Sequence, residues 1–203
     1  MATLITDPDL EEQIRAQRAE WGVDRFDEVW DGTYLINPAR NSEHQHLLGK
    51  LVWALHEALV SSPAIVYPGV NVSDRADDWT KNYRCPDLAV ALPGGIAREC
   101  DAYYLGGPDF LVEIISPCDR SREKLSFYGH VGVRELLLID RDPWALELYQ
   151  LHDGELKLAG QSRLDQPDIV QSTVLPLTFR LIPGDPRPRI EVRHTDGVQA
   201  WLA

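Results

Sequence analysis

An apolar stretch interrupted by a single acid, running from Gly107 to Pro117, constrains this chain more than any other feature. Its apolar residues are large, proline lies at both ends, and it is too short for an ordinary helix, so it predicts a buried central strand. Glu113 sits inside this run. A carboxylate removed from water without a partner is so unfavourable that we expect Glu113 to be protonated, salt-bridged or metal-bound.

Strand geometry predicts which side chains share a face with this glutamate. Alternation places Leu111, Glu113 and Ile115 on one face, and residues 110, 112 and 114 on the other. The following segment, 119–128, has a capping residue, charges in its first turn and apolar residues at helical spacing, so it predicts a helix that returns Lys124 over the strand. Asp87 follows a proline at the polar end of an earlier strand, 85–92. We therefore expect Asp87, Glu113 and Lys124 to converge.

Length and charge limit the possible classes of protein. At 203 residues the chain is most economically one domain, with an N-terminal helical part at 1–25, a core at 26–151 and a C-terminal hairpin and tail at 152–203. The net charge of -12 opposes non-specific binding of polyanions, although a divalent cation can invert the field of a single cleft. No signal peptide and no apolar run of membrane-spanning length are recognised. Three cysteines without a CxxC pair favour reduced thiols and a cytoplasmic location.

The remaining patterns predict an α+β fold, with a mixed β-sheet flanked by α-helices. Helices are expected from Asp7 to about Gly22 and from about Ser42 to Val60, and Asp31-Gly32 is a hairpin signal within 25–36. Segments 73–83 and 93–101 are expected to be loops. Further strands are predicted at 64–70, 134–140, 144–151 and 155–158, with an edge strand at 189–193. The strand order does not follow from these patterns.

Two acids and a lysine at the ends of neighbouring elements suit phosphodiester hydrolysis. Asp87 and Glu113 can hold Mg²⁺ through oxygen ligands, and the backbone carbonyl of Ile114 can add another. Lys124 can orient the attacking water and stabilise charge on the phosphate oxygens. The alternative is a structural one, in which Glu113 and Lys124 form a buried ion pair that fixes the helix on the sheet.

Four motifs carry a family resemblance that spans Phe26 to about Leu151: FDEVWDGTYLINP, NSEHQHLLGKL, CPDLAVAL and GPDFLVEIISPCDRSREKLSFYGHVGVRELLLID. The last is the most specific, because the glutamate, the Ser-Pro after it and the lysine, tyrosine and Gly-Val that follow stand in the family's order. The chain resembles the putative restriction endonuclease-like family of the PD-(D/E)XK nuclease superfamily. The resemblance implies a restriction endonuclease-like core and an endonuclease that uses Mg²⁺ (or Mn²⁺) to cut DNA.

The resemblance also implies roles for individual residues. Asp87 matches the acid of the Pro-Asp motif and Glu113 the second acid. The superfamily's lysine would stand two residues later, where this chain has Ile115, and Lys124 in the following helix matches instead. Glu43 or His44 falls where related nucleases place an extra acidic or polar group, and the choice between them stays open. The expected phosphate contacts are Arg120 and Arg122.

Two other functions compete with the nuclease. One is a non-catalytic homodimeric binding or scaffolding protein that retains the nuclease fold, which the acidic composition favours. The other is a metal-dependent hydrolase of a small phosphorylated substrate. A nuclease that cuts both strands often pairs two active sites, so a homodimer is expected. Asp109 is expected to bond to local backbone, and Tyr128 to belong to the core.

Overall fold

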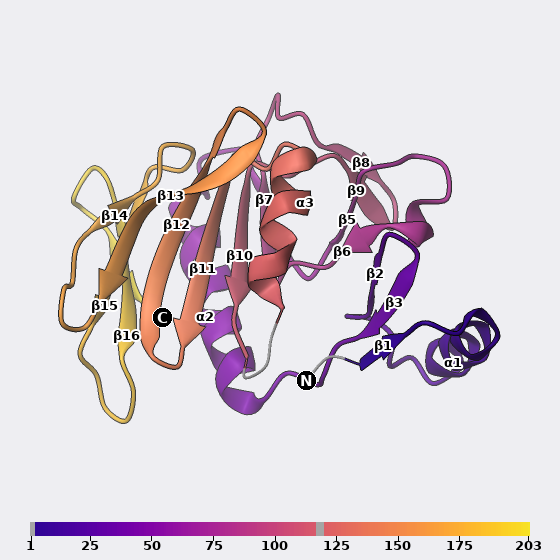
Figure 1. Ribbon diagram of the computed structural model, residues 1–203. Helices are drawn as coiled ribbons and strands as arrows, with labels where there is room; N and C mark the ends of the chain where they lie inside the picture. Colours follow the sequence, from indigo (N-terminus) through magenta and orange to yellow (C-terminus); the bar gives the residue numbers. More distant parts are fainter. Residues whose placement is uncertain (1–2, 117–119) are drawn as a thin grey trace.

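A computed structural model describes residues 3–116 and 120–203 and has a mixed α+β architecture (Figure 1). Its strands form three sheets, of seven, six and four strands. The α-helices of this described part are α1 (Pro8–Glu20), α2 (Ser42–Ala58) and α3 (Leu125–His130), and 3-10 helices are found at η1 (Trp79–Lys81) and η2 (Ser121–Lys124). None of the helices described is both long enough and apolar enough to cross a membrane.

The six-stranded sheet contains the predicted central strand. Strand β10 (Phe110–Ile114) pairs in parallel with β11 and antiparallel with β7, so it has hydrogen-bonded neighbours on both edges. Both of its faces are covered as well, which explains why its sequence is an almost continuous apolar run. The strand order is β13 (Glu155–Arg163), β12 (Trp144–His152), β11 (Glu135–Arg141), β10, β7 (Leu88–Ala91) and β4 (Ile65–Pro68).

The two faces of β10 belong to different core clusters, as the alternation predicted. Phe110, Val112 and Ile114 pack with the apolar stripe of α2 and with the four-stranded sheet. Leu111 lies on the opposite face, in a cluster that includes the apolar side chains of α3. Each large side chain that is fully buried here, such as Leu51 of α2, stabilises the fold by about 1.5–3 kcal/mol.

The four-stranded sheet closes one side of the core (Figure 1). Its order is β14 (Val170–Gln171), β15 (Leu177–Ile182), β16 (Arg189–His194) and β17 (Ala200–Leu202). Burial alternates along β15 and β16, so Phe179 and Val192 point into the same cluster as Val112 of β10. Only the strand at 189–193 was predicted in this region. The four-stranded and six-stranded sheets therefore share one hydrophobic core.

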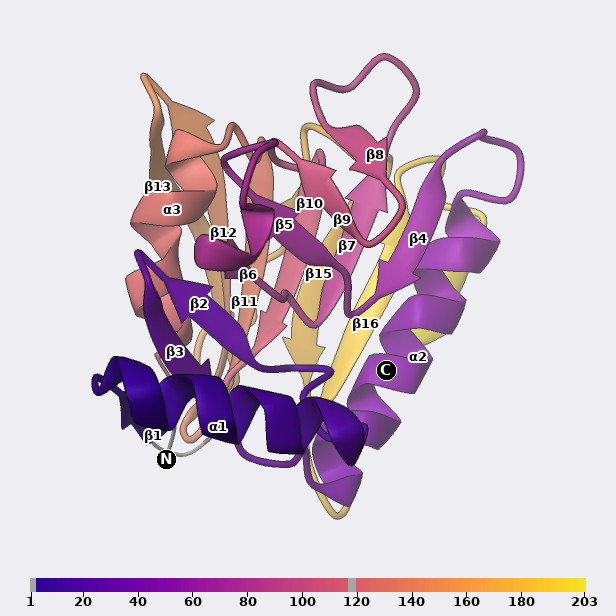
Figure 2. The same ribbon diagram turned by 90° about the vertical axis from the view of Figure 1, so that its right-hand side faces the viewer.

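The seven-stranded sheet begins with the predicted hairpin. Asp31 and Gly32 join β2 to β3 with φ angles of 47° and 84°, the left-handed conformation that a tight two-residue hairpin turn requires. Helix α1 lies beside the end of this sheet that β1 and β3 form (Figure 2). The order is β1 (Thr3–Ile5), β3 (Thr33–Ile36), β2 (Glu28–Trp30), β6 (Tyr83–Arg84), β5 (Asn71–Ser73), β9 (Tyr103–Leu105) and β8 (Arg98–Cys100).

Several local predictions were wrong. The expected loops at 73–83 and 93–101 contain η1, β6 and β8, whose few residues are too short for periodicity to show. The expected mixed sheet is present as the six-stranded sheet, and two further sheets accompany it. The helix expected at 119–128 starts as the 3-10 helix η2 and becomes α-helical only at Leu125. Its predicted cap, Asp119, lies outside the described residues, as does Cys118.

Candidate active site

Asp87 is held at the entry of β7 by three polar groups. The backbone N–H of Ile114 donates to Asp87 Oδ2 at 2.7 Å, and His44 Nε2 lies 3.2 Å from the same oxygen. Arg40 Nη2 lies 2.5 Å from Asp87 Oδ1. Burial alone would raise the pKa of Asp87, but the His44 hydrogen bond and the Arg40 charge hold it below its usual value. Asp87 is therefore a buried but ionised carboxylate.

Glu113 has the opposite electrostatic character. It projects from the α3-facing side of β10, where Tyr128 donates to Glu113 Oε1 at 2.6 Å and Lys124 Nζ lies 3.0 Å from the same oxygen. Burial raises the pKa of Glu113 to about 8; the Lys124 charge opposes this shift and the Asp87 charge adds to it. The predicted ion pair between Glu113 and Lys124 is thus present, and Tyr128 contacts it.

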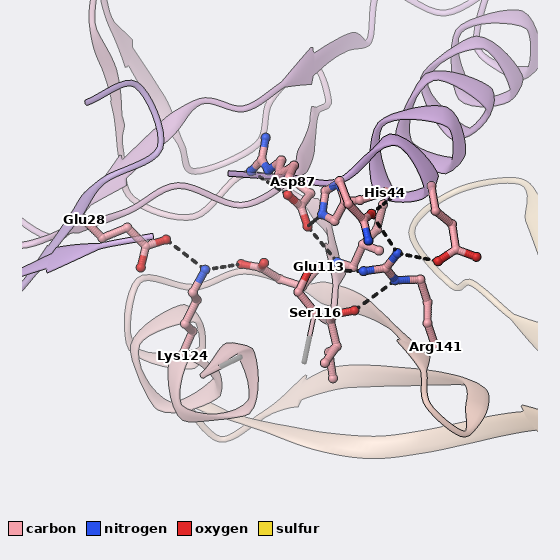
Figure 3. Close-up of polar contacts among 12 residues, drawn as sticks. Glu28, His44, Asp87, Glu113, Ser116, Lys124 and Arg141 are labelled. Atoms are coloured by element: carbon pink, nitrogen blue, oxygen red, sulfur yellow. Dashed lines mark hydrogen bonds and ion pairs between the residues drawn. The ribbon is translucent and has the colours of Figure 1, made fainter. Parts of the chain in front are cut away.

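Lys124 also binds a second acid, Glu28, which the sequence analysis did not single out. Glu28 belongs to β2 of the seven-stranded sheet, is fully buried, and places Oε1 2.8 Å from Lys124 Nζ (Figure 3). The backbone N–H of Cys85 donates to Glu28 Oε1 at 2.9 Å, and Trp30 Nε1 donates to Oε2 at 2.7 Å. Its sequence neighbour Asp27 is equally acidic, so no local pattern distinguishes Glu28 from a surface charge.

Of Glu43 and His44, the structure places His44 against Asp87 and Glu43 against an arginine. His44 is buried against Asp87, whereas Glu43 is 41% exposed and pairs with Arg141 Nη1 at 2.9 Å. Arg141, also missed from the sequence, donates to the carbonyl of Ile115 at 3.1 Å and so ties the end of β10 to the start of α2. The ion pairs of Glu43 are with Arg141 and Arg187, whereas His44 contacts Asp87 directly.

The two predicted phosphate contacts both pair with acids. Arg120 forms an ion pair with Glu123, and its guanidinium lies 4.7 Å from the ring centroid of Trp30. Arg122 Nη2 lies 3.1 Å from Asp140 Oδ2. Asp109, expected to bond to local backbone, instead accepts from the N–H of Leu92, just past β7, at 2.8 Å and pairs with Arg134 at 3.1 Å, at the other end of β10.

The candidate catalytic residues line a small cavity of about 50 Å³. Its lining includes Asp87, Glu113, Ile114, Lys124, His44 and Arg40. A wider cleft of about 680 Å³ adjoins it, because Ser116 and Arg120 line both. Arg122 and Arg141 line the cleft as well. A charged chamber, lined by the buried side chains of Asp87, Glu113 and Lys124, therefore lies next to a larger cleft.

The donor set suits a hard divalent cation. Magnesium is bound by one or two carboxylates together with several waters. Asp87 and Glu113 can supply the carboxylates, and the Ile114 carbonyl can supply a further oxygen ligand. Within residues 3–116 and 120–203, no three His, Cys, Asp or Glu side chains are grouped to hold a metal by themselves. Arg40 and His44 already contact Asp87, so a cation would share that carboxylate with them.

The fold and this geometry define a class of protein. A mixed sheet with an acid after proline at one strand, an acid within the neighbouring strand and a lysine beyond it is the arrangement of a restriction endonuclease-like core. The model of the Uma2 family, described as "Putative restriction endonuclease", matches residues 23–183. The chain belongs to this nuclease family.

A solved structure agrees with this fold. The crystal structure of a "putative nuclease" from Anabaena variabilis, assigned to a domain family of unknown function, matches with a TM-score of 0.57 and 19% sequence identity. The match covers 72% of this chain and 80% of that one. No curated protein sequence matches the chain significantly.

Proposed function

We propose that the protein is a metal-dependent endonuclease that hydrolyses phosphodiester bonds in DNA. One observation carries the proposal: Asp87 just before β7, Glu113 in β10 and Lys124 in η2 line the same cavity. A structural ion pair needs only Glu113 and Lys124. The additional presence of an ionised Asp87 beside them supports a hydrolytic site.

In this proposal each residue has a distinct role. Asp87 and Glu113, with the Ile114 carbonyl, would hold Mg²⁺ or Mn²⁺, which when bound supplies an acidified water and neutralises charge on the phosphate. Lys124 orients that water and stabilises negative charge developing on the phosphate oxygens. His44 fixes the orientation of Asp87 through its Nε2 contact.

The neighbouring cleft supports a polyanionic substrate despite the net charge of -12. Arg120, Arg122 and Arg141 line it, each paired with a carboxylate that a phosphate group can replace. Two copies would be needed to cut both strands, so we propose a homodimer. Light scattering tests this; a monomeric mass at micromolar concentration would contradict it.

The test is a nicking assay on supercoiled plasmid with Mg²⁺, Mn²⁺ or EDTA, beside titration calorimetry of both cations. Glu113→Gln, Asp87→Asn and Lys124→Met are expected to lose at least about a hundredfold in nicking rate, the range typical of removing one electrostatic group. Glu135→Gln is the matched control, because Glu135 is equally buried but bonds to Ser172 and Thr173 away from the cavity.

The outcomes separate the competing functions. Cation binding without nicking would redirect the proposal to RNA or to a small phosphorylated substrate, assayed by phosphate release. Absence of cation binding would favour the non-catalytic scaffold, in which Glu113 and Lys124 are only an ion pair.

A further inference from the structure

Lys124 connects two sheets through two buried carboxylates. Glu113 belongs to the six-stranded sheet and Glu28 to the seven-stranded sheet, and Lys124 Nζ lies 3.0 and 2.8 Å from them. Figure 3 shows the ammonium group between the two acids. One ammonium therefore compensates two carboxylates, only one of which is a candidate cation ligand.

Glu28 is anchored independently of Lys124. Cys85 N–H donates to one of its oxygens and the Trp30 indole N–H to the other. Hydrogen bonds to an ionised acceptor are roughly twice as strong as neutral ones, so they fix the carboxylate. Glu28 is consequently a fixed carboxylate that can hold the Lys124 ammonium group through an ion pair.

From this geometry we infer that Glu28 is a positioning residue, which keeps Lys124 in the cavity when a divalent cation binds Glu113. The inference rests on the proposed function. A cation and an ammonium group compete for the Glu113 carboxylate, since both are attracted to the same oxygens. When a cation takes the Glu113 carboxylate, Lys124 loses its contact with Glu113 and keeps its contact with Glu28. It stays beside the reacting phosphate instead of blocking the cation.

A direct role for Glu28 as a cation ligand is less consistent with its contacts. Both of its oxygens already accept hydrogen bonds from fixed donors. In the part of the chain that the structure describes, it forms no three-member group of metal-ligating side chains with Asp87 and Glu113. Glu28 also does not line the small cavity, whereas Lys124 does.

A double-mutant cycle on Glu28→Gln and Lys124→Met tests the inference, with Mn²⁺ affinity measured by titration calorimetry. In Glu28→Gln the ammonium loses one of its two carboxylate partners among the described residues and is drawn more strongly to Glu113, so we expect Mn²⁺ to bind about tenfold more weakly. In Lys124→Met the ammonium group that competes with the cation is absent. Adding Glu28→Gln to this variant should therefore change the Mn²⁺ affinity by less than about twofold. The nicking rate of Glu28→Gln at saturating Mn²⁺ should also fall, because Lys124 is misplaced.

Two further variants keep the test decisive. Glu135→Gln controls for loss of a buried glutamate and should leave Mn²⁺ affinity unchanged. If Glu28→Gln does not fold, as judged by circular dichroism, Glu28→Asp replaces it: the charge stays, but the shorter side chain cannot reach Lys124 while keeping both anchors, so affinity should again fall.

The results distinguish this inference from the proposed function. Wild-type protein that neither binds Mn²⁺ nor nicks DNA would overturn both. Wild-type protein that does both, with Glu28→Gln binding Mn²⁺ normally, would overturn the inference alone. An equal effect of Glu28→Gln with and without Lys124 would also overturn it, because Glu28 would then act directly on the cation.

Discussion

Replacing Glu113 with glutamine should stabilise the protein increasingly as the pH rises. Burial raises the pKa of this carboxyl group from 4.5 to about 8. Between these values the group holds its proton in the folded state and releases it on unfolding, so a rise in pH favours the unfolded state. Each pH unit in that window costs up to about 1.4 kcal/mol of stability. Glutamine cannot ionise, yet it retains an oxygen that accepts from Lys124 and Tyr128.

The measurement is urea unfolding of both proteins, followed by tryptophan fluorescence in EDTA from pH 5 to pH 8. The free energy of unfolding of Glu113→Gln, relative to wild type, should rise by roughly 3–4 kcal/mol across this range. Glu155→Gln is the control: its carboxylate is 77% exposed, so we expect a difference within about 0.5 kcal/mol at every pH. A pH-independent difference for Glu113→Gln would refute the assignment of a raised pKa.

Three further variants have defined outcomes. Asp87→Asn should lose about 3–5 kcal/mol of stability at pH 7, because the Arg40 guanidinium, whose side chain is only 11% exposed, keeps its charge without its partner; urea unfolding measures this, and a loss below 1 kcal/mol would contradict it. Tyr128→Phe should weaken Mn²⁺ binding at pH 7. The Tyr128 hydrogen bond lowers the pKa of Glu113, so its loss raises this pKa and favours the protonated carboxyl group, which binds a cation poorly. An unchanged calorimetric affinity would count against this reasoning. Leu51→Ala in the core of α2 should cost about 2–5 kcal/mol in thermal or urea unfolding without changing Mn²⁺ affinity, and a change in affinity would argue against a purely structural role.

The parts of the fold that the sequence predicted are those with a local signal. Strand β10 was recognisable from its apolar run, α2 from its helical periodicity, and the β2–β3 turn from Asp31-Gly32. Strands β6 and β8 were not, because they contain two and three residues and exist through pairing with distant strands. The division into three sheets likewise depends on long-range pairing.

The same distinction applies to the candidate site. Asp87, Glu113 and Lys124 were predictable because each is unusual in its local context or stands at a motif position. Glu28 and Arg40 were not, since their importance comes from partners 96 and 47 residues away in the sequence, at Lys124 and Asp87. That His44 contacts Asp87 while Glu43 contacts Arg141 depends on the direction in which each side chain leaves α2.

The energetics of the chamber bear on the choice between nuclease and scaffold. Burying an ion pair removes two hydrated charges from water, and replacing such a pair with well-packed apolar residues is often neutral or stabilising by about 1–4 kcal/mol. A protein that needed only to join its two larger sheets would therefore lose nothing with apolar residues at positions 28, 113 and 124. Here all three positions carry ionisable side chains, and the neighbouring Asp87 carboxylate further disfavours the ionised form of Glu113. A scaffold gains nothing from that repulsion, whereas a divalent cation shared by the two carboxylates would relieve it, which favours the hydrolytic role.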